Sequence, residues 1–151
     1  MLQAVGKIFD PLELTSSFTV RMKCIIQDLW SEEIQWVDPL LTHIEKEWKK
    51  WGEEIPHLGS LKIPRFVLDF TLLEDDVELH SFCDASKKAE GAAIYLGTES
   101  NNGIFVKLVT SKSRAAPLKC VTLQRLELLG SLVTACLACK VKRFVNLKKS
   151  C

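Results

Sequence analysis

Two acidic residues in otherwise apolar surroundings are the side chains of this sequence best suited to chemistry. Asp84 follows the strand-like stretch from Glu78 to Cys83, and Glu127 interrupts an apolar helical pattern 43 positions later. Ionised carboxylates avoid apolar surroundings unless they are paired or bind a metal. A carboxylate on a strand and one on a following helix could share a divalent cation, but by spacing alone two ordinary solvated acids remain the more common arrangement.

The chemistry such a pair would serve is metal-assisted phosphoryl transfer. Two-metal nucleases hold two divalent ions about 3.5–4 Å apart with Asp and Glu side chains. Mg²⁺ prefers oxygen ligands over the nitrogen and sulfur of His and Cys. Asp84 and Glu127 are thus candidates for the first two catalytic, metal-binding positions of such a centre, with a strand-end acid and a solvated helix acid as the alternative.

A basic segment between the two acids could hold a polyanion. The residues from Ser111 to Lys119 are predicted to form a loop that carries Lys112, Arg114 and Lys119. In a nuclease these cations would contact backbone phosphates without reading base sequence. The alternative is a solvated surface loop.

The elements that must position these residues fall into two groups. In the first, apolar side chains recur at helical spacing from Ser17 to Trp30, and a second helix is expected to begin at Asp38-Pro39 and to end between Gly52 and Pro56. A short strand is expected over residues 65–70, and a unit boundary between 72 and 77.

The second group predicts three strands and a long helix. The strands are expected over residues 77–83, 91–97 and 104–110, with an Asn-Gly hairpin signal before the third. Thr122 is a candidate N-cap for a helix that runs to about Phe144. The fold class is therefore α+β, with an antiparallel sheet that one helix covers on one side.

Composition and charge restrict the class of protein. The chain has 151 residues, of which 47% are hydrophobic and 26% are charged, as in globular proteins. Residues 1–106 carry 10 Lys and Arg against 18 Asp and Glu, whereas residues 107–151 carry 10 Lys and Arg and the single acid Glu127. This asymmetry indicates either a polyanionic partner or a solvated basic tail.

The cysteines and the hydropathy pattern bear on the cellular compartment. No signal peptide and no membrane span is recognisable, so the protein is expected to be cytoplasmic or nuclear, with reduced thiols. Cys136 and Cys139 form a Cys-x-x-Cys pair, but a structural zinc site needs four ligands and the sequence holds no second pair. Both are therefore predicted to be small core residues, and His80 to be structural.

Several segments together resemble the Pol polyprotein of BEL/Pao long-terminal-repeat retrotransposons. They occur in that family's order and span nearly the whole chain: Ile8-Phe9-Asp10-Pro11-Leu12, Ile63-Pro64-Arg65, residues 78–86, residues 111–119 and Leu126-Glu127-Leu128. The resemblance implies that residues 1–75 follow the reverse transcriptase palm as helical thumb or connection segments. It further implies that residues 76–151 open a ribonuclease H-like domain.

The resemblance also implies an activity and partners. Asp84 matches the family's first metal-binding Asp, and Glu127 its metal-binding Glu on the first long helix. The parent activity is then RNA-directed DNA synthesis with Mg²⁺-dependent hydrolysis of RNA in RNA–DNA hybrids. Its partners are an RNA–DNA hybrid or other nucleic acid and the rest of the Pol polyprotein, without a membrane.

Departures from the family pattern limit what this chain is expected to do. Glu13 stands in place of a usual Gly, and Glu90 in place of an aromatic or similar residue. The ribonuclease H fold needs a third Asp on a later strand, but no Asp follows Asp84 in this sequence. We therefore expect a truncated, catalytically inactive unit.

Two alternatives remain. A non-catalytic remnant that binds nucleic acid is compatible with the basic last third of the chain. The region has also been classed as a retrotransposon peptidase, but an aspartic protease needs Asp-Thr-Gly or Asp-Ser-Gly so that two carboxylates share a proton. Neither tripeptide occurs here.

Overall fold

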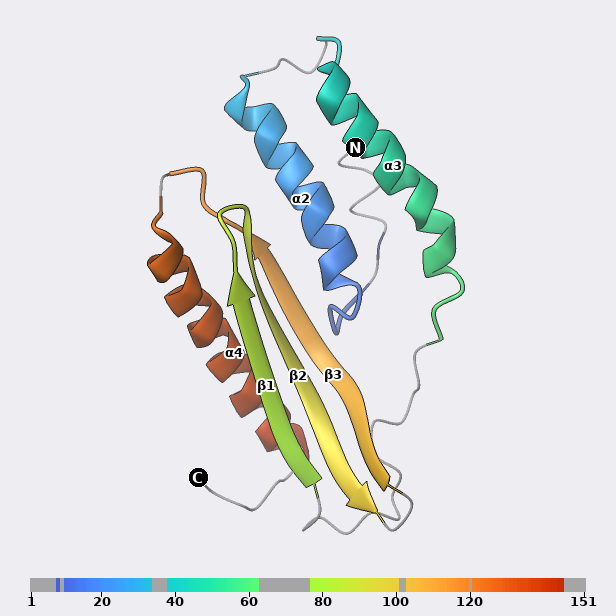
Figure 1. Cartoon of the computed structure of the whole chain (residues 1–151), viewed down its shortest axis with the longest axis vertical. Coiled ribbons are helices and arrows are strands. Elements are labelled where there is room, and N and C mark those ends of the chain that lie inside the picture. The colour runs from blue at the N-terminus through green and yellow to red at the C-terminus, as the bar shows by residue number, and fades with distance from the viewer. Residues whose placement is uncertain are drawn as a thin grey trace.

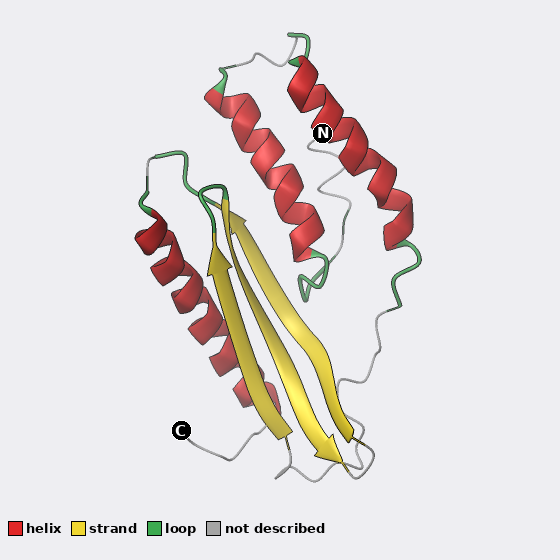
Figure 2. Cartoon of the chain, in the orientation of Figure 1, coloured by secondary structure: helices red, strands yellow, loops and turns green. Residues whose placement is uncertain are grey.

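The computed structural model describes residue 8 and residues 10–33, 38–62, 77–100, 103–119 and 121–145. Three helices and three strands follow one another along the chain (Figures 1 and 2): α2 (Ser16–Ser31), α3 (Thr42–Leu58), β1 (Val77–Ala85), β2 (Ala89–Ser100), β3 (Gly103–Ala115) and α4 (Leu123–Val145). The predicted α+β class is confirmed. The strand expected over residues 65–70 and the boundary expected between 72 and 77 fall almost wholly outside the described residues.

The three strands form an antiparallel meander in the order β1-β2-β3. All three are longer than predicted, and β3 continues through Ser111 to Ala115, where a loop was expected. The loop prediction was wrong because β2 runs for 12 residues and pairs with β3 as far as Ala89 and Ala115. In addition, the N–H of Ser111 donates to the carbonyl of Leu12, 3.1 Å away, on the outer edge of β3.

Helices lie on both faces of the sheet, so the prediction of a single covered face was wrong. Helix α4 packs along β1 and β2, whereas α2 lies against β3 on the other side (Figure 1). Ser16 at the start of α2 explains this second contact: its hydroxyl lies 2.8 Å from the Ser111 hydroxyl, and its carbonyl accepts a hydrogen bond from the Ser113 hydroxyl. The helical spacing of apolar residues in α2 does not predict these contacts, because they join residues about 95 positions apart in the sequence.

The face of the sheet that meets α4 is buried and largely apolar. Alternate residues of β2 point to this face, as the period of a strand requires, and all are buried: Glu90, Ala92, Ile94, Leu96 and Thr98. Leu126, Val133 and Val141 of α4 are buried as well. A Cβ atom on Gly130 would lie 3.8 Å from the carbonyl oxygen of Asp84, an ordinary contact distance, so this turn of α4 lies directly beside the end of β1.

Helix α4 begins as the sequence predicted. The N–H of Arg125 donates to the hydroxyl of Thr122, 3.4 Å away, which satisfies one of the free N–H groups of the first turn. The helix then continues to Val145. Thr122 is therefore the N-cap.

Helices α2 and α3 share a separate core. Met22 and Ile25 of α2 meet Ile44 and Trp51 of α3, and all four are buried. Helix α3 begins at Thr42 rather than at Asp38-Pro39 and continues through Gly52 and Pro56, which were expected to end it. Pro56 lacks the N–H that would bond to the carbonyl of Gly52, and the helix ends two residues later at Leu58.

The segment before α2 is held by side-chain hydrogen bonds. The carboxylate of Asp10 accepts bonds from the N–H groups of Leu14 and Thr15. Glu13, between Asp10 and Leu14, has a positive φ of 51°. Its carboxylate lies 2.8 Å from the Lys112 ammonium group. The usual Gly of the resembling family fits such a left-handed backbone without the steric cost that Glu incurs.

Replacement of Glu13 tests this backbone strain. Glu13→Ala and Glu13→Gly both remove the ion pair with Lys112, but only glycine adopts the positive φ freely. We expect Glu13→Gly to be about 1 kcal/mol more stable than Glu13→Ala. Urea denaturation of the two variants measures the difference, and equal stabilities would contradict a strained φ at this position.

Among the described helices, none combines the length and the apolar character needed to cross a lipid bilayer.

Candidate metal and nucleic-acid site

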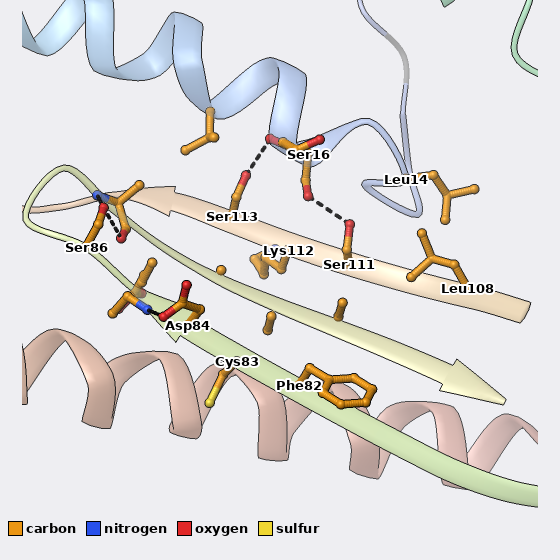
Figure 3. A pocket seen from close by; sticks show the side chains of 18 of the residues that line it. Leu14, Ser16, Phe82, Cys83, Asp84, Ser86, Leu108, Ser111, Lys112 and Ser113 are labelled. Carbon is orange, nitrogen blue, oxygen red and sulfur yellow. Dashed lines mark hydrogen bonds between the residues drawn. The ribbon is translucent and has the colours of Figure 1, made fainter. Parts of the chain in front are cut away.

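Asp84 is the penultimate residue of β1 rather than the residue that follows the strand. It pairs with Gly91 of β2, is exposed, and receives a hydrogen bond at Oδ1 from the N–H of Ala85, 2.8 Å away. Its carboxylate points away from α4, whereas neighbouring Cys83 points toward it (Figure 3). β1 has no neighbouring strand on its outer side among the described residues, so Asp84 lies at an accessible sheet edge.

Glu127 lies in the second turn of α4 and is exposed. Its neighbour Leu126 is buried against the sheet, so the Glu127 side chain projects from the flank of the helix rather than from its outermost side. No ion pair fixes the carboxylate within the described part of the chain. Both predicted metal ligands are thus free to accept another partner.

A short series of contacts joins the backbones that carry these two acids. The hydroxyl of Ser131 donates to the carbonyl oxygen of Glu127, 2.9 Å away, and lies 3.6 Å from the sulfur of Cys83. Cys83 directly precedes Asp84, and the turn at Gly130 packs against the carbonyl of Asp84. The fold therefore brings the Glu127 turn of α4 beside the Asp84 end of β1.

The two carboxylates are of the ligand type that Mg²⁺ prefers, but they are too few for a two-metal centre. Carboxylates are the ligands that Mg²⁺ prefers, and Asp84 and Glu127 supply two. Within the described residues, however, no three side chains among His, Cys, Asp and Glu come together to form a possible metal site. These residues alone do not make a complete two-metal centre, and no catalytic step follows from them.

The three predicted phosphate-binding residues have different surroundings. Lys112 lies on β3, is half-buried, and pairs with Glu13. Arg114 at the end of the same strand and Lys119 beyond it are exposed, and no acid within the described segments pairs with them. Only Arg114 and Lys119 therefore present an unneutralised charge.

A groove of about 480 Å³ between α2 and the sheet was not anticipated from the sequence. Asp84 lies on its wall, together with Phe82, Leu108 and Ser111 (Figure 3). The alternation Ser111-Lys112-Ser113-Arg114 was the available signal, because small residues at every second position leave one face of a strand open. Reading this segment as a loop concealed it.

The structure also describes the surroundings of Cys136, Cys139 and His80. Cys136 and Cys139 are exposed on α4, so their assignment as core residues was wrong. Their neighbours Val133, Leu137 and Val141 fill the face of α4 that meets the sheet. His80 is exposed and lies over Gly97, where a Cβ atom would lie 2.9 Å from its Nε2 atom, and its structural role stays a prediction.

One comparison with known protein families decides what this chain is. The model of the Pao retrotransposon-like RNaseH-like domain matches residues 1–151. The chain belongs to this family. No curated protein and no solved structure matches it. The sequence resemblance to a BEL/Pao retrotransposon Pol region is thereby confirmed.

Membership of the Pao RNaseH-like family agrees with the observed sheet and helix. Domains of this kind generally use divalent metals and act within a polyprotein that handles nucleic acid. The arrangement β1-β2-β3 with α4 packed on the sheet is consistent with that family.

Proposed function

We propose that this Pao RNaseH-like chain contributes to a Mg²⁺-dependent centre that hydrolyses RNA in RNA–DNA hybrids. Asp84 and Glu127 are two of its metal-binding carboxylates. The observation that carries the proposal is the contact between the Glu127 turn of α4 and the Asp84 end of β1, through Ser131 and Cys83. The parent polyprotein would also perform RNA-directed DNA synthesis, with residues 1–75 as thumb or connection segments and residues 76–151 as the ribonuclease H-like part.

The residues of this chain have separate tasks in such a centre. Bound divalent ions would activate water and neutralise developing charge on the phosphate. Asp84 and Glu127 would hold them, and Arg114 and Lys119 would bind backbone phosphates of the hybrid. Because no third acid joins Asp84 and Glu127 among the described residues, the chain alone is expected to be inactive, and further carboxylates must come from elsewhere.

Metal binding tests the two acids independently of catalysis. We expect Mn²⁺ to broaden the amide NMR signals of Ala85 and Glu127 selectively, because a paramagnetic ion relaxes nearby nuclei. Asp84→Asn and Glu127→Gln should each weaken this broadening. Glu99→Gln should not, because Glu99 is an exposed acid on β2 away from the proposed site. Broadening that persists in both site variants would refute the assignment.

An activity assay tests the expected lack of catalysis. Purified chain with Mg²⁺ should not cleave an RNA–DNA hybrid above the rate of the Asp84→Asn variant. Robust cleavage that depends on Asp84 would overturn the claim of inactivity while supporting the site itself.

The second candidate function is binding of nucleic acid without chemistry, which the exposed Arg114 and Lys119 favour. We expect the Arg114→Ala and Lys119→Ala double variant to bind a hybrid more weakly and to lower the slope of log K against log salt by about two. Lys112→Ala should change the slope less, because Glu13 already neutralises that lysine. Affinity should survive Asp84→Asn, and an unchanged slope in the double variant would contradict the assignment.

A further inference from the structure

The outer surface of α4 carries large apolar side chains that are exposed. This helix packs on the sheet through one side only (Figure 1), and its opposite side exposes 69% of Leu128 and 60% of Leu132. Isolated exposed leucines are common on protein surfaces, but exposed residues that recur along one side of a helix, apolar ones among them, indicate a contact surface.

The spacing of the exposed residues suits a second helix. Counting along α4, successive steps of four and three residues connect the members of this row: Arg125, Leu129, Leu132, Cys136, Cys139 and Arg143. This alternation keeps side chains on the seam between two packed helices. Two leucines per helix are too few to hold a stable pair of helices by themselves, so a second source of affinity is needed.

Cys136 and Cys139 occupy two consecutive positions of this row, and both are exposed. Residues three apart on a helix have Cβ atoms about 5–6 Å apart. Two sulfurs bound to one tetrahedral Zn²⁺, at about 2.3 Å each, lie about 3.8 Å from one another, which side chains at this spacing can reach. One chain thus supplies two thiolates of the four that a closed zinc site requires.

We propose that Cys136 and Cys139 of two copies of this chain bind one zinc ion between their α4 helices. The second copy supplies the missing pair of ligands. Four thiols lose four protons and bind Zn²⁺ as thiolates, so the centre has a net charge of −2. A two-fold axis parallel to α4 would also place Leu129 and Leu132 opposite their own counterparts in the partner copy.

The neighbouring charges favour this centre. Lys140 follows Cys139 directly, and Arg143 lies one turn beyond it in the same row. Two copies therefore bring four positive charges beside a centre of charge −2. Without the metal, the same four charges would repel one another and oppose pairing of the helices.

The other described thiols are poorly placed to compete. Cys83 lies on β1 against Ser131. Cys24 lies on α2, is half-buried, and has its sulfur 3.5 Å from the carbonyl oxygen of Lys88. Burial raises the pKa of this thiol, which disfavours the thiolate that zinc binds. The inference rests on α4 alone and does not depend on the proposed nuclease function.

The oligomeric state of the full chain tests the zinc site. Under reducing conditions, analytical ultracentrifugation should show a monomer with EDTA and a dimer with Zn²⁺ at one ion per two chains. Co²⁺ should give the absorption of a tetrahedral thiolate complex. Cys136→Ser and Cys139→Ser should each abolish the dimer and the Co²⁺ spectrum, whereas Cys83→Ser and the double variant Cys120→Ser, Cys151→Ser should retain both.

Three outcomes would overturn the proposal. These are a chain that stays monomeric with Zn²⁺, a zinc dimer that survives both Cys136→Ser and Cys139→Ser, and a spectrum that is lost in the Cys120 and Cys151 double variant. Circular dichroism of each serine variant shows whether it folds. Leu132→Ala leaves the thiols intact, and it should weaken the zinc dimer several-fold without changing the Co²⁺ spectrum.

Discussion

Trp51→Ala is expected to reduce the free energy of unfolding by about 3–5 kcal/mol, as for other large aromatic residues removed from a core. Trp51 is 0% exposed and stacks on Phe18 and Trp48, with ring centroids 4.7 and 5.4 Å apart. Its indole N–H also donates to the carbonyl of Phe18, 3.1 Å away. The substitution therefore removes a central, fully buried part of the contact between α2 and α3.

The measurement is urea denaturation together with amide hydrogen exchange of α3. Trp51→Phe keeps a ring but loses the indole N–H, so it should have an intermediate effect. Trp30→Ala is the matched control, because Trp30 is 57% exposed and its loss should change stability by less than about 0.5 kcal/mol. Equal effects at both tryptophans would contradict the core that α2 and α3 share.

Glu90→Met is expected to stabilise the protein by about 1–3 kcal/mol. Glu90 is 6% exposed on the face of the sheet that meets α4, and its Oε2 atom has no hydrogen-bond partner. A buried polar atom without a partner costs about 1–3 kcal/mol, and more when it is charged. Methionine has a similar length, contains no charged group, and adapts to irregular spaces.

Thermal and urea denaturation of Glu90→Met measure this gain. Glu99→Met is the matched control on the same strand, where the glutamate is exposed and its replacement should be nearly neutral. A loss of stability in Glu90→Met would show that a positive group, such as Arg114 across the strand pair, compensates the buried carboxylate. A gain in stability would show that Glu90, in place of the aromatic or similar residue usual in the family, destabilises the fold.

The sequence predicted those features that depend on neighbours along the chain. The helical period over residues 17–30, the Thr122 cap and the Asn-Gly signal before β3 all concern residues within a few positions of one another. The structure confirms the helix, the cap and the hairpin, but each strand ends a few residues later than predicted. Strand length was underestimated because pairing with β2 extends β3 into a stretch whose own residues read as a loop.

The candidate site could be predicted only as residue types. A strand acid and a helix acid of the family pattern could be named from the sequence, and the fold places the backbones that carry Asp84 and Glu127 side by side. Their role as metal ligands stays a prediction. The neutralisation of Lys112 could not be foreseen, because its partner Glu13 lies 99 positions away in the sequence.

The sequence by itself determined the α+β class and the order of the elements, since periodicity, caps and turns are local properties, and its motifs identified the family. Only the tertiary structure decided which side of each element is covered. It placed α2 on the second face of the sheet and turned Cys136 and Cys139 of α4 outward. The physical reason is that an apolar helix can bury only the stripe that meets its neighbour, and the position of that neighbour is set by contacts between distant parts of the chain.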